Sequence, residues 1–166
     1  MTITDFSRGT EPFAFTAKAN IWGSTAAVDI ILDEETPRGS HTIEKIYPCI
    51  DRIVQRVDMK RAKLEQALLD DGWLETAEDW AAQGKVSKRE QGCYLLDDGN
   101  KVYLPLNEDG FCDSLFVESV CIYFDDELEV NDVTIYIVCS PDYFAGHAIA
   151  VFLDSDGDIR VKGLEQ

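Results

Sequence analysis

Apolar and polar residues alternate near the start of the chain. Residues Phe13–Ala19 follow this period of two, Trp22 and Gly23 interrupt it, and a second β-rich run occupies Ala26–Leu32. Alternation at every second position is the pattern of a strand with one buried face. The two runs therefore predict an opening β-hairpin.

The pattern becomes helical after residue 40. Thr42 is expected to cap a helix, and Pro48 to kink it or to make it begin near Tyr47. Two further helical segments, residues 60–71 and 73–82, are separated by Gly72, which is suited to ending a helix. The first helix is predicted by apolar residues spaced three and four apart, namely Ile46, Tyr47, Ile50, Ile53, Val54 and Val57.

The rest of the chain is mostly β-rich, with segments paired around turns. Such pairs are typical of antiparallel hairpins. The expected fold is α+β, a mainly antiparallel sheet with two or three helices packed on one face, in a single domain over residues 1–166. The pairs are Cys93–Leu96 with Val102–Leu104, Val120–Phe124 with Val133–Val138, and His147–Leu153 with Ile159–Lys162, and residues 111–117 are expected as a short helix.

Charge narrows the choice of partners. The chain has 32 acidic and 15 basic residues and a formal net charge of −17, and Lys101 is the one base between Gln91 and Asp158, a segment with fifteen acids. This much negative charge is unsuited to nucleic acid and to anionic membrane surfaces. The expected macromolecular partner is a basic protein.

The N-terminus and the cysteines point to the cytoplasm. Residues 1–6 have neither a basic start nor an apolar stretch, and no segment has the length of apolar residues that a membrane span needs. Five cysteines, an odd number without a CxxC pair, favour reduced thiols over disulfides. We therefore expect a cytoplasmic protein that does not enter a membrane.

The densest acidic segment joins two predicted strands. A solvated loop has this composition, and so does a site for divalent cations or for a patch of Lys and Arg on a partner. The functional interpretation is that this segment contacts a basic partner through Asp125, Asp126, Glu127, Glu129 and Asp132.

A second acidic turn carries Asp154, Asp156 and Asp158. The spacing is similar to that of an EF-hand loop, but Ile159 stands where that loop requires glycine. An acidic β-turn is therefore favoured over a calcium site, which stays a third possibility. Because His41 and His147 are the two histidines of the chain, zinc is not expected, and no metal or other cofactor is predicted.

A small-ligand pocket or an active site is the alternative to a binding surface. His147 could act as a general base if a carboxylate such as Asp142 lies beside it, and Tyr143 and Phe144 could pack against a ligand. The simpler interpretation of His147 is a histidine that is hydrogen-bonded to the backbone at the start of a strand. No feature singles out one cysteine as a nucleophile.

One basic stripe lies on the first predicted helix. Arg52, Arg56 and Lys60 are spaced four apart, and Arg61 and Lys63 follow. Such a stripe can suggest nucleic acid, but acids share the same region, so we expect it to balance the acidic face or to be solvated.

The closing segment resembles a known family. Residues Ser140–Ile149, followed by Val151–Asp154 and Gly157, resemble the end of an uncharacterised bacterial family catalogued as a domain of unknown function, in which an aromatic-x-Gly-His-x-Ile element leads into a hairpin. The resemblance covers Phe111–Leu164, with a similar Trp22-Gly23 strand upstream. It implies an α+β bacterial, cytosolic domain and supplies no catalytic residues.

Resemblance and charge together set the expected function. Small acidic bacterial domains of this kind are often immunity or inhibitor proteins encoded beside toxins, an analogy at the level of the fold. The expected function is therefore a non-enzymatic acidic binding protein, with an immunity protein that engages a basic toxin as its specific form. The alternative is a small-ligand-binding protein or enzyme with the pocket around Tyr143, Phe144 and His147.

Overall fold

A twisted seven-stranded sheet forms the body of the protein, for which a computed structural model describes residues 3–10 and 12–166. Neighbouring strands are antiparallel except for β3 and β7, which run parallel. In spatial order the strands are β1 (Thr4–Arg8), β2 (Phe15–Ile21), β3 (Ser24–Leu32), β7 (Leu115–Phe124), β8 (Val130–Cys139), β9 (Ala148–Leu153) and β10 (Ile159–Glu165).

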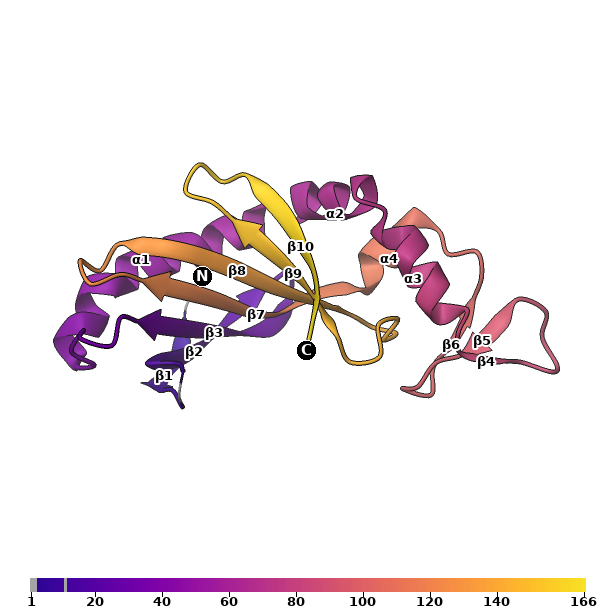
Figure 1. Ribbon diagram of the computed structural model, residues 1–166, viewed down its shortest axis with the longest axis horizontal. Helices are drawn as coiled ribbons and strands as arrows, with labels where there is room; N and C mark the ends of the chain where they lie inside the picture. Colours follow the sequence, from indigo (N-terminus) through magenta and orange to yellow (C-terminus); the bar gives the residue numbers. More distant parts are fainter. Residues whose placement is uncertain (1–2, 11) are drawn as a thin grey trace.

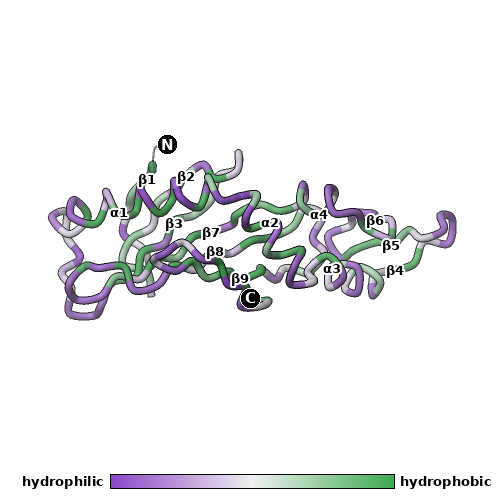
Figure 2. The backbone as a smooth tube through the Cα atoms, turned by 90° about the horizontal axis from the view of Figure 1, so that it is seen from above, coloured by the Kyte–Doolittle hydropathy of each residue, from purple (hydrophilic) through white to green (hydrophobic). Residues whose placement is uncertain are grey.

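Helices cover one face of this sheet. Helices α1 (Ser40–Met59) and α2 (Arg61–Asp70) run along it, as Figures 1 and 2 show. The apolar side of α1 is buried against the strands, and its members are Ile46, Ile50, Ile53, Val54 and Val57. These are the positions that the three-and-four spacing predicts, with Tyr47 as the exception at 36% exposed.

The start of α1 differs from the prediction. Gly39 is the N-cap residue, and Thr42 lies inside the helix, where its hydroxyl donates to the carbonyl oxygen of Pro37. The helix also continues through Pro48 instead of beginning near Tyr47. Thr42 is therefore bonded to the preceding loop, which fixes the entry of the chain into α1.

The opposite sheet face is not covered by a helix within the described residues. Along β3, Val28 and Ile30 are fully buried under the helices, whereas the alternate residues Asp29 and Ile31 are only half-buried. The same alternation continues in β7 and β8. We call this second surface the open face, and define it by Asp29, Ile31, Glu118, Cys121, Tyr123, Asp132, Thr134, Tyr136 and Glu165.

A smaller unit lies at the far end of the elongated molecule (Figure 1). The Asp98 carboxylate accepts a hydrogen bond from the backbone N–H of Asp142 at 2.9 Å, which ties this unit to the loop after β8. The unit consists of α3 (Trp73–Ala81), a three-stranded sheet of β4 (Lys85–Val86), β5 (Cys93–Leu95) and β6 (Lys101–Tyr103), and α4 (Glu108–Ser114).

The α+β class and the mainly antiparallel sheet are confirmed, as are the predicted hairpins. Strand β1 was not predicted. The short helix expected at 111–117 lies at Glu108–Ser114 instead, because Asn107 caps it by accepting from the N–H of Gly110, and Leu115–Val117 belong to β7.

Candidate functional site

Two adjoining hollows mark the open face. They have volumes of about 410 and 310 Å³ and share Ile31, Cys121 and Tyr136 in their walls. Tyr123 lines the smaller hollow and Phe13 the larger one. Aromatic and aliphatic side chains that are half-exposed in this way are common at the centres of protein interfaces.

Four carboxylates lie among these apolar groups. Asp29 accepts a hydrogen bond from the Thr16 hydroxyl at 2.8 Å, and Asp132 accepts one from the Thr134 hydroxyl at 3.2 Å. Glu165 accepts from the Tyr136 hydroxyl at 3.2 Å, and the exposed Glu118 lines the larger hollow. Within the described part of the chain, none of the four forms an ion pair.

Burial and the nearby carboxylates raise the pKa of two side chains on this face, Tyr136 and Cys121. Burial, and then the charge of Glu165, raises the pKa of the Tyr136 phenol to about 12. Burial, and then the charges of Asp29 and Asp132, raises the pKa of the Cys121 thiol to about 11. A thiol of this kind is uncharged at neutral pH, so the face offers no activated sulfur nucleophile at Cys121.

The acidic turn predicted between the two strands connects β7 to β8 at one end of the open face. Asp125 is a structural member of this turn, because its carboxylate accepts hydrogen bonds from the N–H groups of Glu127 and Glu129 at 3.0 and 2.9 Å. The side chains of Asp126, Glu127 and Glu129 are exposed. Asp132 lies further along, on the open face itself.

Basic residues lie at the margins of the open face. Lys18 forms an ion pair with Asp5 at 3.8 Å on the β2 side. On the β10 side, Arg160 and Lys162 lie over the Phe152 ring at 4.8 and 5.5 Å from its centre. Lys162 also reaches onto the face, because it donates to the Thr134 hydroxyl at 3.4 Å beside Asp132. Carboxylates still outnumber bases at the centre of the face and in the acidic turn.

The second acidic turn, residues 154–158, meets the basic stripe of the helical side. Lys60 donates to the carbonyl oxygen of Gly157 at 2.9 Å, and Lys63 lies 3.4 Å from Asp158. Asp154 accepts from the N–H of Asp158 at 2.8 Å, and Asp156 is exposed. No three His, Cys, Asp or Glu side chains are grouped to hold a metal ion anywhere in residues 3–10 and 12–166. Lys60 and Lys63 of this stripe therefore balance an acidic turn of their own chain.

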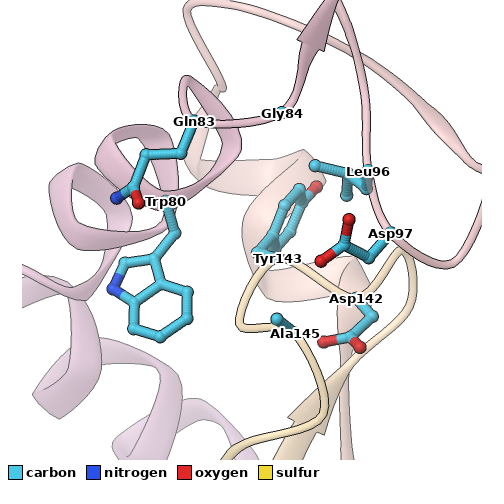
Figure 3. Close-up of a pocket in the computed structure, with 8 residues that line it drawn as sticks. All are labelled: Trp80, Gln83, Gly84, Leu96, Asp97, Asp142, Tyr143 and Ala145. Atoms are coloured by element: carbon cyan, nitrogen blue, oxygen red, sulfur yellow. The ribbon is translucent and has the colours of Figure 1, made fainter.

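A hollow of about 140 Å³ lies between the small unit and the loop after β8 (Figure 3). Figure 3 shows the Tyr143 ring between the Trp80 indole and the Asp97 carboxylate. Burial raises the pKa of the Tyr143 phenol. The walls are Trp80, Gln83, Gly84, Leu96, Asp97, Asp142, Tyr143 and Ala145.

The four residues of the predicted pocket are only partly brought together. Asp142 and Tyr143 line the hollow, whereas Phe144 is fully buried behind it. Nδ1 of His147 lies 2.8 Å from the carbonyl oxygen of Phe144, and the imidazole packs edge-on against Trp80 at 5.5 Å. The Asp142 carboxylate accepts from the N–H groups of Phe144 and Gly146 at 3.2 and 2.7 Å instead of bonding His147.

Sequence reasoning missed the other walls of this hollow. Trp80 carried a signal, because it follows Trp73 and Ala77 at helical spacing. In the sequence, Asp97 lies in the turn between two predicted strands and carries no further signal. Its position near Asp142 results from the packing of the small sheet, which local patterns do not predict.

A family model described as "Uncharacterized protein conserved in bacteria (DUF2262)" matches residues 3–164. The chain belongs to the DUF2262 family. The match confirms the resemblance to a bacterial domain of unknown function and extends it over nearly the whole chain. No curated protein and no solved structure matches this DUF2262 chain. In the residues that the structure describes, no helix of the DUF2262 chain is long and apolar enough to cross a membrane.

Proposed function

We propose that this DUF2262 chain is a non-enzymatic binding protein, and that its acidic turn and open face engage a basic protein surface. The observation that carries the proposal is the crowding of unpaired acids in one turn and the strand that follows it: among the described residues, Asp126, Glu127, Glu129 and Asp132 have no cationic partner within 4 Å. Among the bases that the structure describes, Lys60 and Lys63 contact the 154–158 turn, Arg160 lies at the margin of the open face, and Lys45 lines a hollow with Asp126 without forming an ion pair with it.

Physical chemistry gives this arrangement two consequences. Exposed like charges on one surface repel each other and accelerate encounter with a surface of opposite charge, an effect that salt screens. Half-exposed Tyr123, Tyr136 and Ile31 offer apolar area that a partner would bury, which favours a lasting complex over electrostatic encounter alone. The acids would set the rate of association with the partner, and Tyr123, Tyr136 and Ile31 would set the lifetime of the complex.

A basic toxin is the specific partner class that we put forward, with the DUF2262 chain as its immunity or inhibitor protein. The acidic charge and the bacterial family agree with this assignment, which stays a prediction. The cytoplasm is the compartment in which such an inhibitor would act.

Affinity capture tests the proposal. The tagged chain is used to capture proteins from its native cell at low salt, beside a variant with Asp126→Asn, Glu127→Gln, Glu129→Gln and Asp132→Asn. A matched control removes the same four charges at the far end of the molecule, with Glu75→Gln, Asp79→Asn, Asp109→Asn and Asp113→Asn, all at exposed positions. We expect a basic protein to be retained by the wild type and the control and lost from the first variant. Equal retention by all three would contradict the proposal.

The alternative function is a small-ligand site or an active site around Asp142, Tyr143, Phe144 and His147. Asp142 and Tyr143 in the wall of one hollow support it. The backbone bonds of His147 and Asp142 count against proton transfer between them, because the carboxylate that would orient the imidazole is already bonded elsewhere. We therefore favour the binding surface.

A further inference from the structure

A cleft opens through the large sheet where β8 and β9 separate. Pairing between the two strands ends at Thr134 and Phe152, and the β9–β10 hairpin bends away from β8 beyond this point (Figure 1). Residues 130–133 of β8 therefore pair with β7 alone. Helix α1 closes the back of the cleft, which has a volume of about 480 Å³, within the range of small-molecule sites.

Three arginines line this cleft. Arg52 and Arg56 are one turn apart on α1, and Arg160 comes from β10. Arg56 donates to the carbonyl oxygen of Ser155 at 3.2 Å, and Arg160 lies over the Phe152 ring, so these two guanidinium groups are held in place. Arg52 makes no hydrogen bond or ion pair in the described residues.

The absence of carboxylate partners is the informative point. The chain has more than twice as many acids as bases, yet within the described residues none of these arginines forms an ion pair. Two carboxylates also line the cleft, but Asp132 accepts from the Thr134 hydroxyl and Asp154 from the N–H of Asp158. Guanidinium groups without an internal counterion are suited to an oxyanion from outside, which they bind through planar pairs of N–H groups.

The remaining wall is apolar. Ile53, Val133 and Leu153 are each less than a tenth exposed, and the half-buried ring of Phe152 stands beside them. A ligand of this cleft would therefore present its anionic group to the arginines and an apolar part to these side chains. Nucleic acid does not fit, since a polyanion is repelled by the net charge of −17, whereas a small anion carries little charge to repel.

We propose that the cleft between α1 and the β9–β10 hairpin binds a small organic oxyanion, a carboxylate or a phosphate attached to an apolar group. The cleft borders the open face, because Asp132 lines both and Arg160 lies at the margin of that face, whereas Arg52 and Arg56 lie on the helix behind the sheet.

Titration monitored by amide NMR tests the proposal, with phenyl phosphate and benzoate as probes and phenol as the neutral control. We expect the two anions to shift resonances of residues 52–56, 130–133 and 152–160, and phenol to shift them far less. The stronger of the two anions identifies phosphate or carboxylate as the preferred group. Shifts at other places, or no shifts at millimolar concentration of either anion, would overturn the proposal.

Charge-neutral variants locate the site. Arg52→Gln removes the arginine without internal bonds and is expected to weaken binding about tenfold with unchanged melting temperature. Arg89→Gln, at an exposed position in the small unit, is the matched control and should bind as the wild type does. Equal affinity of the Arg52→Gln variant and the control would refute the assignment to this cleft.

Discussion

The ammonium group of Lys60 donates a hydrogen bond to the carbonyl oxygen of Gly157 at 2.9 Å, across 97 positions of the chain. Lys60 follows α1 directly, and Gly157 has φ of +84° in the turn between β9 and β10. The contact holds that hairpin against the helical side, so it positions the cleft as well as balancing an acidic turn.

Replacement of Lys60 by Met is expected to destabilise the protein. Met keeps the apolar stem but removes the charged donor, and loss of a partly buried charge-assisted hydrogen bond costs about 1–2 kcal/mol. Urea denaturation measures the free energy of unfolding. Lys88→Met, at an exposed position, removes the same charge elsewhere and should cost much less. If the two variants unfold at the same urea concentration, the contact does not stabilise the hairpin.

Asp125 should behave differently from its acidic neighbours. Its carboxylate accepts two backbone N–H groups, so Asp125→Ala is expected to cost about 1–2 kcal/mol of stability. Glu127→Gln removes an exposed charge from the same turn and should leave stability within about 0.5 kcal/mol of wild type. Thermal unfolding of both variants decides the matter, and equal melting temperatures would show that the turn does not depend on Asp125.

The raised pKa of the Tyr136 phenol predicts that the folded protein loses stability at high pH. Its pKa is raised to about 12 by burial and by Glu165, and the phenol of the unfolded chain ionises near its usual pKa of about 10. The unfolded state thus loses its proton first, and stability should fall as pH rises through the window between these values.

Ultraviolet titration at alkaline pH detects this phenol, and comparison with Tyr136→Phe isolates its signal. Glu165→Gln should lower the pKa of Tyr136, because it removes the second-largest cause of the shift. An unshifted titration in the Glu165→Gln variant would show that the hydrogen bond between the two side chains is not formed.

Two cysteines should be inert in the folded protein. Burial raises the pKa of Cys139 to about 12, and that of Cys121 is about 11. Because alkylation requires the thiolate, iodoacetamide at neutral pH should modify both at least about a hundredfold more slowly than in urea. Mass spectrometry of timed digests gives the rate at each cysteine. Rapid alkylation of Cys121 in the native protein would reopen a thiol mechanism on the open face.

Local patterns accounted for much of the fold. The alternation at Ala26–Leu32 and the apolar spacing from Ile46 to Val57 each follow from the geometry of a single element. The strand and the helix that they predict are both confirmed. Strand β1 was missed because Phe6 is its one partly buried residue, so no alternation marks it. It exists through pairing with β2, which short-range patterns do not reveal.

The sites depended on contacts between distant segments. The acidic turn was visible in the sequence, but Asp29, Glu118 and Glu165 come together on the open face only through the parallel pairing of β3 with β7 and the return of β10. The stripe from Arg52 to Lys60 was visible too, yet its meeting with the 154–158 turn is a tertiary contact. For Asp142 and His147, proximity in sequence suggested a pair that backbone hydrogen bonds prevent.

The most direct test of the acidic surface is the rate of association with the captured basic partner, measured by stopped flow at increasing salt. The account predicts that the wild-type rate constant falls about tenfold or more between low and high salt, and that the variant lacking the charges of Asp126, Glu127, Glu129 and Asp132 associates slowly at all salt concentrations. A wild-type rate that does not change with salt would contradict it.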